Sequence, residues 1–264
     1  MIGIANIFLP LFIQILLLYG LSRAVDRIVL QRLGRRWYLL TMWPGVVCHE
    51  LSHLIACLAT FTRVRRVRLF YPSGDSLGFV EHDRTGNPLK KVVISIAPLF
   101  GVTAAMLLLA WALLPDLYHS SLSTVQAAVV DFSSFASFFR FTVQYFSQFW
   151  DTVSSLVQAF NWDSWQTYVF IYLMLSLSSH AAPSREDLSH TFSGLLGIAA
   201  LFTLFFIVDQ WLQVPMTWTV ISWMTTPLFL AAQFLMYGIL FAAISLCVLV
   251  LLSLVARPLI KRIE

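Results

Sequence analysis

The sequence predicts an all-α membrane protein with about six transmembrane helices. Of its 264 residues, 59% are hydrophobic and 11% are charged, and the mean hydropathy is +0.79. A soluble domain averages about 25% charged residues, so this composition excludes an ordinary soluble protein. The net charge of +4 belongs to loops that orient the chain in a membrane, and it does not indicate nucleic-acid binding.

Six segments meet the requirement of about 20 mostly apolar residues for a membrane-spanning helix. They are residues 2–22, 38–61, 92–115, 165–182, 194–214 and 227–256. The first segment has no charged start and no small-residue cleavage site, so we expect a retained helix and not a signal peptide. The fourth segment is the weakest, because it turns polar at its end. We interpret residues 1–264 as one polytopic membrane domain.

Between the second and third predicted spans, residues 63–84 predict a membrane-associated β-hairpin. Apolar residues alternate with charged ones on both sides of a Pro-Ser-Gly-Asp turn. The two arms carry Val64, Val67, Leu69 and Tyr71, and Leu77, Phe79 and Glu81. A solvated basic loop is the alternative.

The segment between the third and fourth spans, residues 116–164, predicts one or two amphipathic helices in the membrane interface. Phe132, Phe135 and Phe139 follow roughly helical spacing, while Ser, Gln and Asp interrupt the apolar residues every few positions. Such a segment suits the interface better than the hydrocarbon. Substrate gating, partner binding and anchoring are all open roles, with anchoring the default.

Basic residues indicate the orientation. They are frequent after the second span and at the C-terminal end, which places both in the cytoplasm. The arginines within residues 23–36 oppose this orientation unless the first helix does not fully span. We expect an integral multi-pass protein of the cell membrane, with its site nearer the cytoplasmic side. The sequence does not indicate an oligomeric state.

The stretch V-V-C-H-E-L-S-H-L-I-A-C, within the helix predicted over 38–61, predicts a zinc site. Residues four apart share one helix face, so His49 and His53 can offer their imidazoles to one ion. Glu50 points about 100° around the helix, where it can take a proton from a metal-activated water without being a ligand. Burying these groups without a partner would cost several kcal/mol, which a bound cation offsets. We expect one Zn²⁺ per chain.

A catalytic zinc usually has three protein ligands, so a third must come from elsewhere. The polar region 178–192 holds the candidates His180, Glu186, Asp187 and His190. Asp187 follows Ser184 in the pattern P-S-x-x-D, where a helix should begin. Ser184 as N-cap and Asp187 three residues later are nearly a capping box, which would explain both without a metal. The residues alone support a ligand and a cap equally, with Glu186 as the fallback ligand and His190 as a surface or outer-shell residue.

The H-E-L-S-H motif on the second of six predicted helices resembles the site-2 protease family of intramembrane zinc metalloproteases. The hairpin and the stretch K-K-V-V-I-S-I-A-P-L-F-G (90–101) are similar to that family's β-loop and to the A-G-P-x-x-N stretch of its next helix. The resemblance covers roughly residues 38–114 and 165–200. The chain departs from the pattern in lacking the glycine of A-G-P and the glycine that follows the family's aspartate.

The resemblance implies that Asp187 is the third zinc ligand, because P-S-x-x-D lies where the family has its ligand aspartate. Ser179 stands where the family has a substrate-contacting asparagine, eight residues before Asp187. Ser179 or His180 would then hydrogen-bond the substrate, and a packing or capping role is the alternative. An exposed hairpin edge near Leu77 and Phe79 is expected to bind an unwound substrate segment by strand addition.

The function expected from these features is hydrolysis of peptide bonds in membrane-embedded or membrane-associated protein substrates by a zinc metalloendopeptidase. Glu50 is the expected general base. One alternative is a zinc protease of the type that trims prenylated proteins at the membrane surface, with Glu186 as third ligand. The other is a non-catalytic metal-binding scaffold or transporter. Transport would require ionisable residues along several helices, and the predicted spans carry few outside the site.

Overall fold

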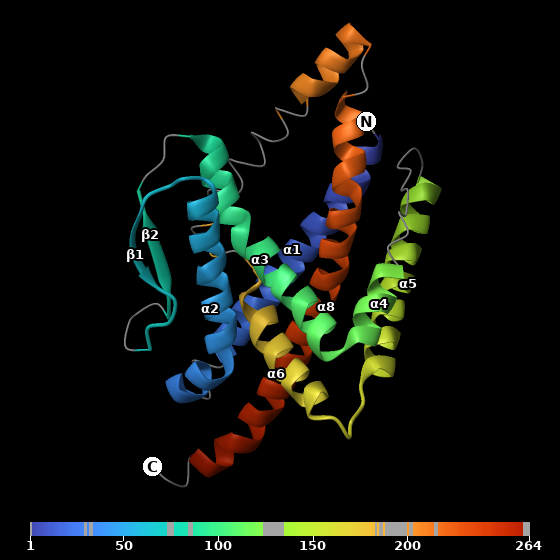
Figure 1. Ribbon diagram of the computed structural model, residues 1–264. Coiled ribbons are helices and arrows are strands. Elements are labelled where there is room, and N and C mark those ends of the chain that lie inside the picture. Colours follow the sequence, from blue (N-terminus) through green and yellow to red (C-terminus); the bar gives the residue numbers. More distant parts are fainter. Residues whose placement is uncertain are drawn as a thin grey trace.

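The computed structural model confirms a mostly helical chain with one small two-stranded sheet (Figure 1). The helices are α1 (Ile2–Ile28), α2 (Arg35–Ala59), α3 (Pro88–Leu113), α4 (Pro115–Ser123), α5 (Phe135–Ala159), α6 (Trp165–His180), a short helix (Thr203–Leu212) and α8 (Met216–Ile260). The structure describes residues 2–28, 31, 34–72, 77–83, 87–123, 135–182, 184, 187, 200, 203–213 and 216–260.

Two of the described helices are long and apolar enough to cross a membrane. These stretches are Leu89–Leu113 in α3 and Ala231–Leu251 in α8. α2 carries two arginines in its first turn, as well as Glu50 and two histidines, and these polar groups lower its hydropathy. α6 has 16 residues, fewer than the roughly 20 that a straight crossing requires. Six spans therefore stay a prediction, and part of the fifth, residues 194–214, lies outside the described residues.

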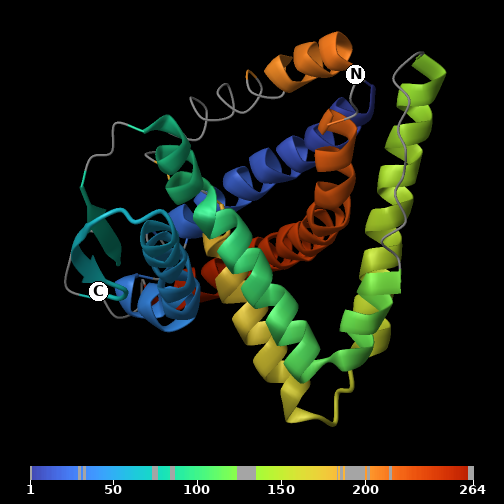
Figure 2. The same ribbon diagram turned by 45° about the horizontal axis from the view of Figure 1, so that its top comes forward.

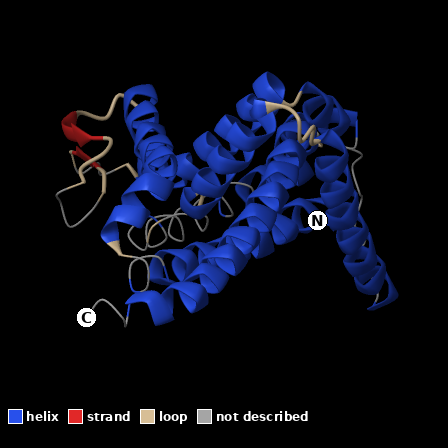
Figure 3. Cartoon of the chain, turned by 90° about the horizontal axis from the view of Figure 1, so that it is seen from below, coloured by secondary structure: helices blue, strands red, loops and turns tan. Residues whose placement is uncertain are grey.

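The predicted β-hairpin is confirmed. Strands β1 (Val64–Arg68) and β2 (Phe79–His82) pair antiparallel, with an irregularity between Val64 and Arg66. The turn residues 73–76 lie outside the described part of the chain. Figures 1 and 3 show the hairpin beside α2, at one edge of the molecule. The hairpin therefore lies beside the helix that carries the H-E-L-S-H motif.

Contacts at both ends of α2 attach the hairpin to it. At one end, Val64 and Val80 pack against a small apolar cluster that contains Ala56 and Cys57 of α2. At the other end, the Arg35 guanidinium donates two hydrogen bonds to the Pro72 carbonyl, at 2.7 and 3.1 Å. The hairpin is thus fixed to both ends of the helix that it covers.

The main apolar core lies where α6 packs among α1, α3 and α8. Its largest fully buried side chains include Phe170 of α6, Met106 of α3, and Phe234 and Tyr237 of α8. Figure 2 shows α3 passing in front of α1 and α8, with α6 alongside α3, and α4 and α5 next to each other at one side of the molecule. Helices α4 and α5 occupy the predicted interfacial segment, of which residues 124–134 lie outside the described chain. α6 also packs against α2, so it joins this core to the H-E-L-S-H helix.

Candidate metal centre

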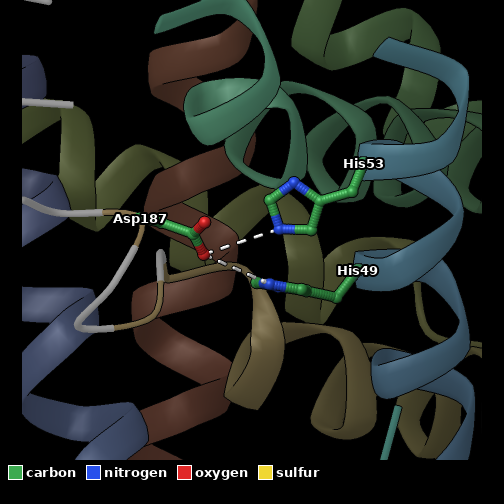
Figure 4. A group of neighbouring side chains, drawn as sticks. All are labelled: His49, His53 and Asp187. Atoms are coloured by element: carbon green, nitrogen blue, oxygen red, sulfur yellow. Dashed lines mark ion pairs between the residues drawn. The ribbon is translucent and has the colours of Figure 1, made fainter. Parts of the chain in front are cut away.

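Three side chains that could bind a metal come from distant parts of the sequence and meet beside α2. His49 and His53 project from one face of α2 toward Asp187 (Figure 4). Asp187 Oδ2 lies 3.7 Å from His49 Nε2 and 3.5 Å from His53 Nε2. The potential ligand atoms of the three residues all lie within 4.8 Å of one another. The structure thus brings together the three residues that the sequence nominated as ligands.

Each imidazole is held by a backbone carbonyl on its far side. His49 Nδ1 lies 2.8 Å from the carbonyl oxygen of His180, and His53 Nδ1 lies 2.8 Å from that of Ile94. A carbonyl can only accept, so each Nδ1 must carry the proton. In the neutral ring, Nε2 then presents a lone pair toward Asp187. Metal-binding histidines are commonly oriented in this way by a partner on the second nitrogen.

The resulting arrangement attracts a cation. Two Nε2 lone pairs and a carboxylate oxygen face one another, and three acceptors repel unless a positive charge lies among them. A zinc ion bound at about 2.0–2.2 Å in tetrahedral geometry holds its ligand atoms about 3.3 Å apart. The observed 3.5 and 3.7 Å separations are close to that value. These two separations are compatible with a shared zinc ion, and all the potential ligand atoms lie within 4.8 Å of one another.

Asp187 also forms a capping box. The Ser184 amide donates to Asp187 Oδ2 at 2.9 Å, and the Asp187 amide donates to Ser184 Oγ at 3.1 Å. These reciprocal hydrogen bonds are those expected of a helix N-terminus. The oxygen that accepts from Ser184 is the same one that faces both imidazoles. Cap and ligand were alternatives in the sequence, but in the structure the cap holds the carboxylate in the position where it faces the histidines.

Glu50 lies beside the metal-binding group and against the hairpin. It interacts electrostatically with His49, His53 and Asp187. A Cβ atom at Gly78, just before β2, would lie 2.7 Å from Glu50 Cγ. Only glycine lets the hairpin come this near, so the strand covers Glu50 closely. The side chains of His49, His53 and Asp187 keep 12–14% of their surface exposed, so the group is not fully closed off from its surroundings.

A series of hydrogen bonds between α2 and α6 fixes the position of His49 relative to α6. Pro44 has no amide proton and leaves the Leu40 carbonyl unpaired within α2. The Tyr172 hydroxyl donates to that carbonyl at 2.7 Å. One turn further along, the Gly45 amide donates to Ser176 Oγ at 2.9 Å. The contact between His49 and the His180 carbonyl continues the series, because 172, 176 and 180 lie on one face of α6.

Replacing Gly45 with Ala should separate α2 from α6. A Cβ at this position would lie 2.2 Å from the Ser176 carbonyl oxygen, a backbone atom that cannot turn aside. Overpacking of this kind costs about 1–3 kcal/mol, which exceeds the gain of about 1 kcal/mol from alanine's helix propensity. We expect a lower thermal-unfolding midpoint in detergent and weaker metal binding. Gly20→Ala is the matched control, because nothing lies within 4 Å of that Cβ. Equal midpoints for both variants would contradict the tight α2–α6 contact.

The remaining predicted site residues lie around this centre in different roles. Ser179 is buried, its hydroxyl donates to the Leu175 carbonyl at 2.9 Å, and its own carbonyl accepts from Ser22. These contacts favour the packing role for Ser179. The His180 imidazole lies against Gly45, and the residue reaches the site through its carbonyl. Glu186 and His190 lie outside the described residues.

The two hairpin residues proposed to contact substrate lie at the start of the second arm. Phe79 pairs with Arg68, and the Leu77 carbonyl accepts from the Tyr71 amide at 2.5 Å. The edge of β2 that does not face β1 is unpaired within the described chain. Substrate addition at a hairpin edge stays a prediction.

The sequence reasoning missed the carbonyl partners of the two histidines and the roles of Tyr172 and Ser176. The Pro44-Gly45 pair inside an apolar helix was the available signal, because it predicts an unpaired carbonyl and a close helix contact. Comparisons of the chain with protein-family models, with curated proteins and with solved structures gave no match.

Proposed function

We propose that the protein is a zinc metalloendopeptidase that hydrolyses peptide bonds of membrane-embedded protein substrates. The observation that carries this proposal is the pair of hydrogen bonds from the histidine Nδ1 atoms to backbone carbonyls. They turn both Nε2 atoms toward Asp187. Three possible metal ligands then face one another, and their side chains stay 12–14% exposed. A catalytic zinc site has this composition, with three protein ligands and one position open. The resemblance of H-E-L-S-H and the following hairpin to site-2 proteases supports the same assignment.

Each residue has a distinct role in the proposed reaction. His49, His53 and Asp187 would hold the ion. Zinc would supply Lewis-acid chemistry, polarising the scissile carbonyl and acidifying the attacking water. Glu50 accepts the proton of that water and passes it to the leaving amine. Because Gly78 lies against Glu50, a substrate that pairs with the hairpin would pass close to this carboxylate.

The membrane setting defines the substrate class. α3 packs against α2, and the carbonyl of Ile94 in α3 holds His53, so the metal centre lies beside an apolar helix of membrane-spanning length. We infer an integral multi-pass protein whose centre is reached from within the bilayer. A substrate helix hides its amides in internal hydrogen bonds and must unwind before attack. The hairpin beside α2 offers the unwound segment a strand to pair with.

Chelation tests the proposal directly. The purified full chain should contain about one zinc, and 1,10-phenanthroline should abolish cleavage of a fluorogenic transmembrane peptide. Added Zn²⁺ should restore it, because the carbonyls that orient the two histidines belong to the protein backbone. The non-chelating isomer 1,7-phenanthroline is the matched control and should leave cleavage unchanged. A protein without zinc would indicate instead that a protonated histidine balances Asp187, as in a scaffold with an ion pair. A zinc-loaded protein that cleaves no member of a panel of such peptides would favour a non-catalytic metal site.

A further inference from the structure

An aromatic side chain occupies a strained position at the end of α2. The Thr62 amide donates to the Cys57 carbonyl at 2.8 Å, and the Phe61 amide donates to that of Leu58 at 3.0 Å. These bonds form a Schellman motif, whose left-handed position is usually glycine. Here that residue is Phe61, with φ of 53°, and the residue is 92% exposed. A bulky residue in this conformation is an outlier, and such outliers often mark functional positions.

Exposed basic residues lie on the segments that follow this aromatic residue and at the start of α3. Arg63 and Arg66 follow it and are exposed, and Lys91 is exposed in the first turns of α3. The Asp83 amide donates to the Arg63 carbonyl at 2.9 Å, which ties the start of β1 to the segment before α3. Within the described part of the chain, the salt bridge of this surface joins Arg65 to Asp83. Arg63, Arg66 and Lys91 form no ion pair among the described residues, although Arg66 lies opposite Glu81 in the strand pairing. We call Phe61, Arg63, Arg66 and Lys91 the basic rim.

The basic rim lies at one end of a candidate membrane span. Figure 1 shows the end of α2, the start of β1 and the start of α3 at the same end of the molecule. The apolar stretch of α3 begins at Leu89, so in a membrane this end lies at the level of the headgroups. Leu58 and Leu89 beside the rim are more than half exposed, which is ordinary for side chains that face lipid.

We propose that the basic rim binds anionic phospholipid headgroups, with the Phe61 ring inserted among them. Exposed aromatic and basic residues together at a helix end are typical of membrane-interface anchors. Basic side chains at this level attract anionic lipids, and the aromatic ring gains from leaving water. An acidic protein partner would use the cations but would not explain a strained, exposed phenylalanine next to exposed leucines. The inference rests on α3 crossing the membrane and does not depend on the metal or on proteolysis.

Lipid retention tests the proposal without an activity assay. The full chain is equilibrated in detergent with equimolar phosphatidylglycerol and phosphatidylcholine, and the bound lipids are counted by native mass spectrometry. The wild type should retain phosphatidylglycerol in preference. Each basic residue near an anionic surface strengthens binding about fivefold, so Arg63→Gln with Lys91→Gln should lower that preference about 25-fold. Arg36→Gln is the control for loss of charge, because Arg36 is exposed at the opposite end of α2.

The variant Phe61→Gly distinguishes the effect of Phe61 on stability from its effect on lipid binding. Glycine suits the left-handed position, and an exposed ring contributes little packing, so the thermal midpoint in detergent should rise. Lipid retention should fall in the same variant. A lower midpoint with unchanged retention would assign Phe61 a structural role and overturn the proposal. The proposal would also be overturned if the wild type showed no preference for phosphatidylglycerol, or if Arg36→Gln lost that preference equally. Polyglutamate, added as a soluble acidic polymer, should not displace the lipid, and its binding in place of phosphatidylglycerol would contradict the proposal.

Discussion

Replacing Glu50 with Gln should lower peptide hydrolysis about 10²–10⁴-fold and leave the metal content at its wild-type level. Glu50 lies outside the group of ligand atoms formed by His49, His53 and Asp187. Glutamine has nearly the same shape, so the close contact with Gly78 is preserved. The variant loses the carboxylate that accepts the proton, while the three proposed metal ligands and the contact with the hairpin stay the same. Activity on a fluorogenic transmembrane peptide and zinc content by atomic absorption are the two measurements.

Asp151→Asn is a suitable control for the Glu50 variant. Asp151 is exposed on α5, which Figure 1 shows far from α2, so its loss should leave hydrolysis unchanged. If Glu50→Gln lost its zinc, Glu50 would be a ligand and the assignment of the general base would be wrong. If the variant kept full activity, another group would have to accept the proton. In the expected case, the inactive variant can be used to trap substrates.

Replacing Asp187 with Ala should weaken zinc binding by more than about 100-fold, because loss of an outer-shell partner alone costs about 10–100-fold. Alanine at this position would remove both the proposed zinc ligand and the carboxylate of the capping box. Two further variants separate the roles. Asp187→Asn keeps an oxygen that can accept from the Ser184 amide but removes the charge. Ser184→Ala keeps the carboxylate and removes the hydroxyl that accepts from the Asp187 amide.

The expected pattern is loss of zinc in both Asp187 variants and retention in Ser184→Ala. The serine variant should lose about 1 kcal/mol of stability, the usual effect of removing an N-cap side chain. Zinc content and the midpoint of thermal unfolding in detergent report the two roles independently. If Asp187→Asn kept its zinc, Asp187 would act as a cap alone. The third ligand would then have to be sought at Glu186 or His180.

Three glycines allow neighbouring segments to pack closely around the helix that carries the histidines. Gly45 lets α6 approach α2, Gly78 lets the hairpin approach Glu50, and Gly101 lets α3 approach Ser52. In each case a Cβ would lie within 3.0 Å of a neighbouring atom. The helix that carries the histidines is therefore in close contact with three partners. Such packing restricts the positions of the ligands, as a preorganised site requires.

Features that depend on local periodicity could be predicted from the amino-acid sequence. The i, i+4 spacing puts His49 and His53 on one helix face in any α-helix, and the alternation around residues 63–84 predicts the hairpin that the structure contains. The pattern P-S-x-x-D likewise predicts the capping box, because a cap involves residues only three apart. These interactions are local, so the residue types and their spacing specify them.

The way in which these local parts come together depends on long-range packing, which the sequence pattern does not reveal. The carbonyl that holds His49 comes from a residue 131 positions away, and the carbonyl that holds His53 comes from one 41 positions away. A backbone carbonyl is present in every residue, so no sequence pattern marks these two. The same holds for Asp187, which local pattern could assign equally to a cap or to a ligand. It serves as the cap and faces both imidazoles because the packing of α6 against α2 brings the following segment to the histidines.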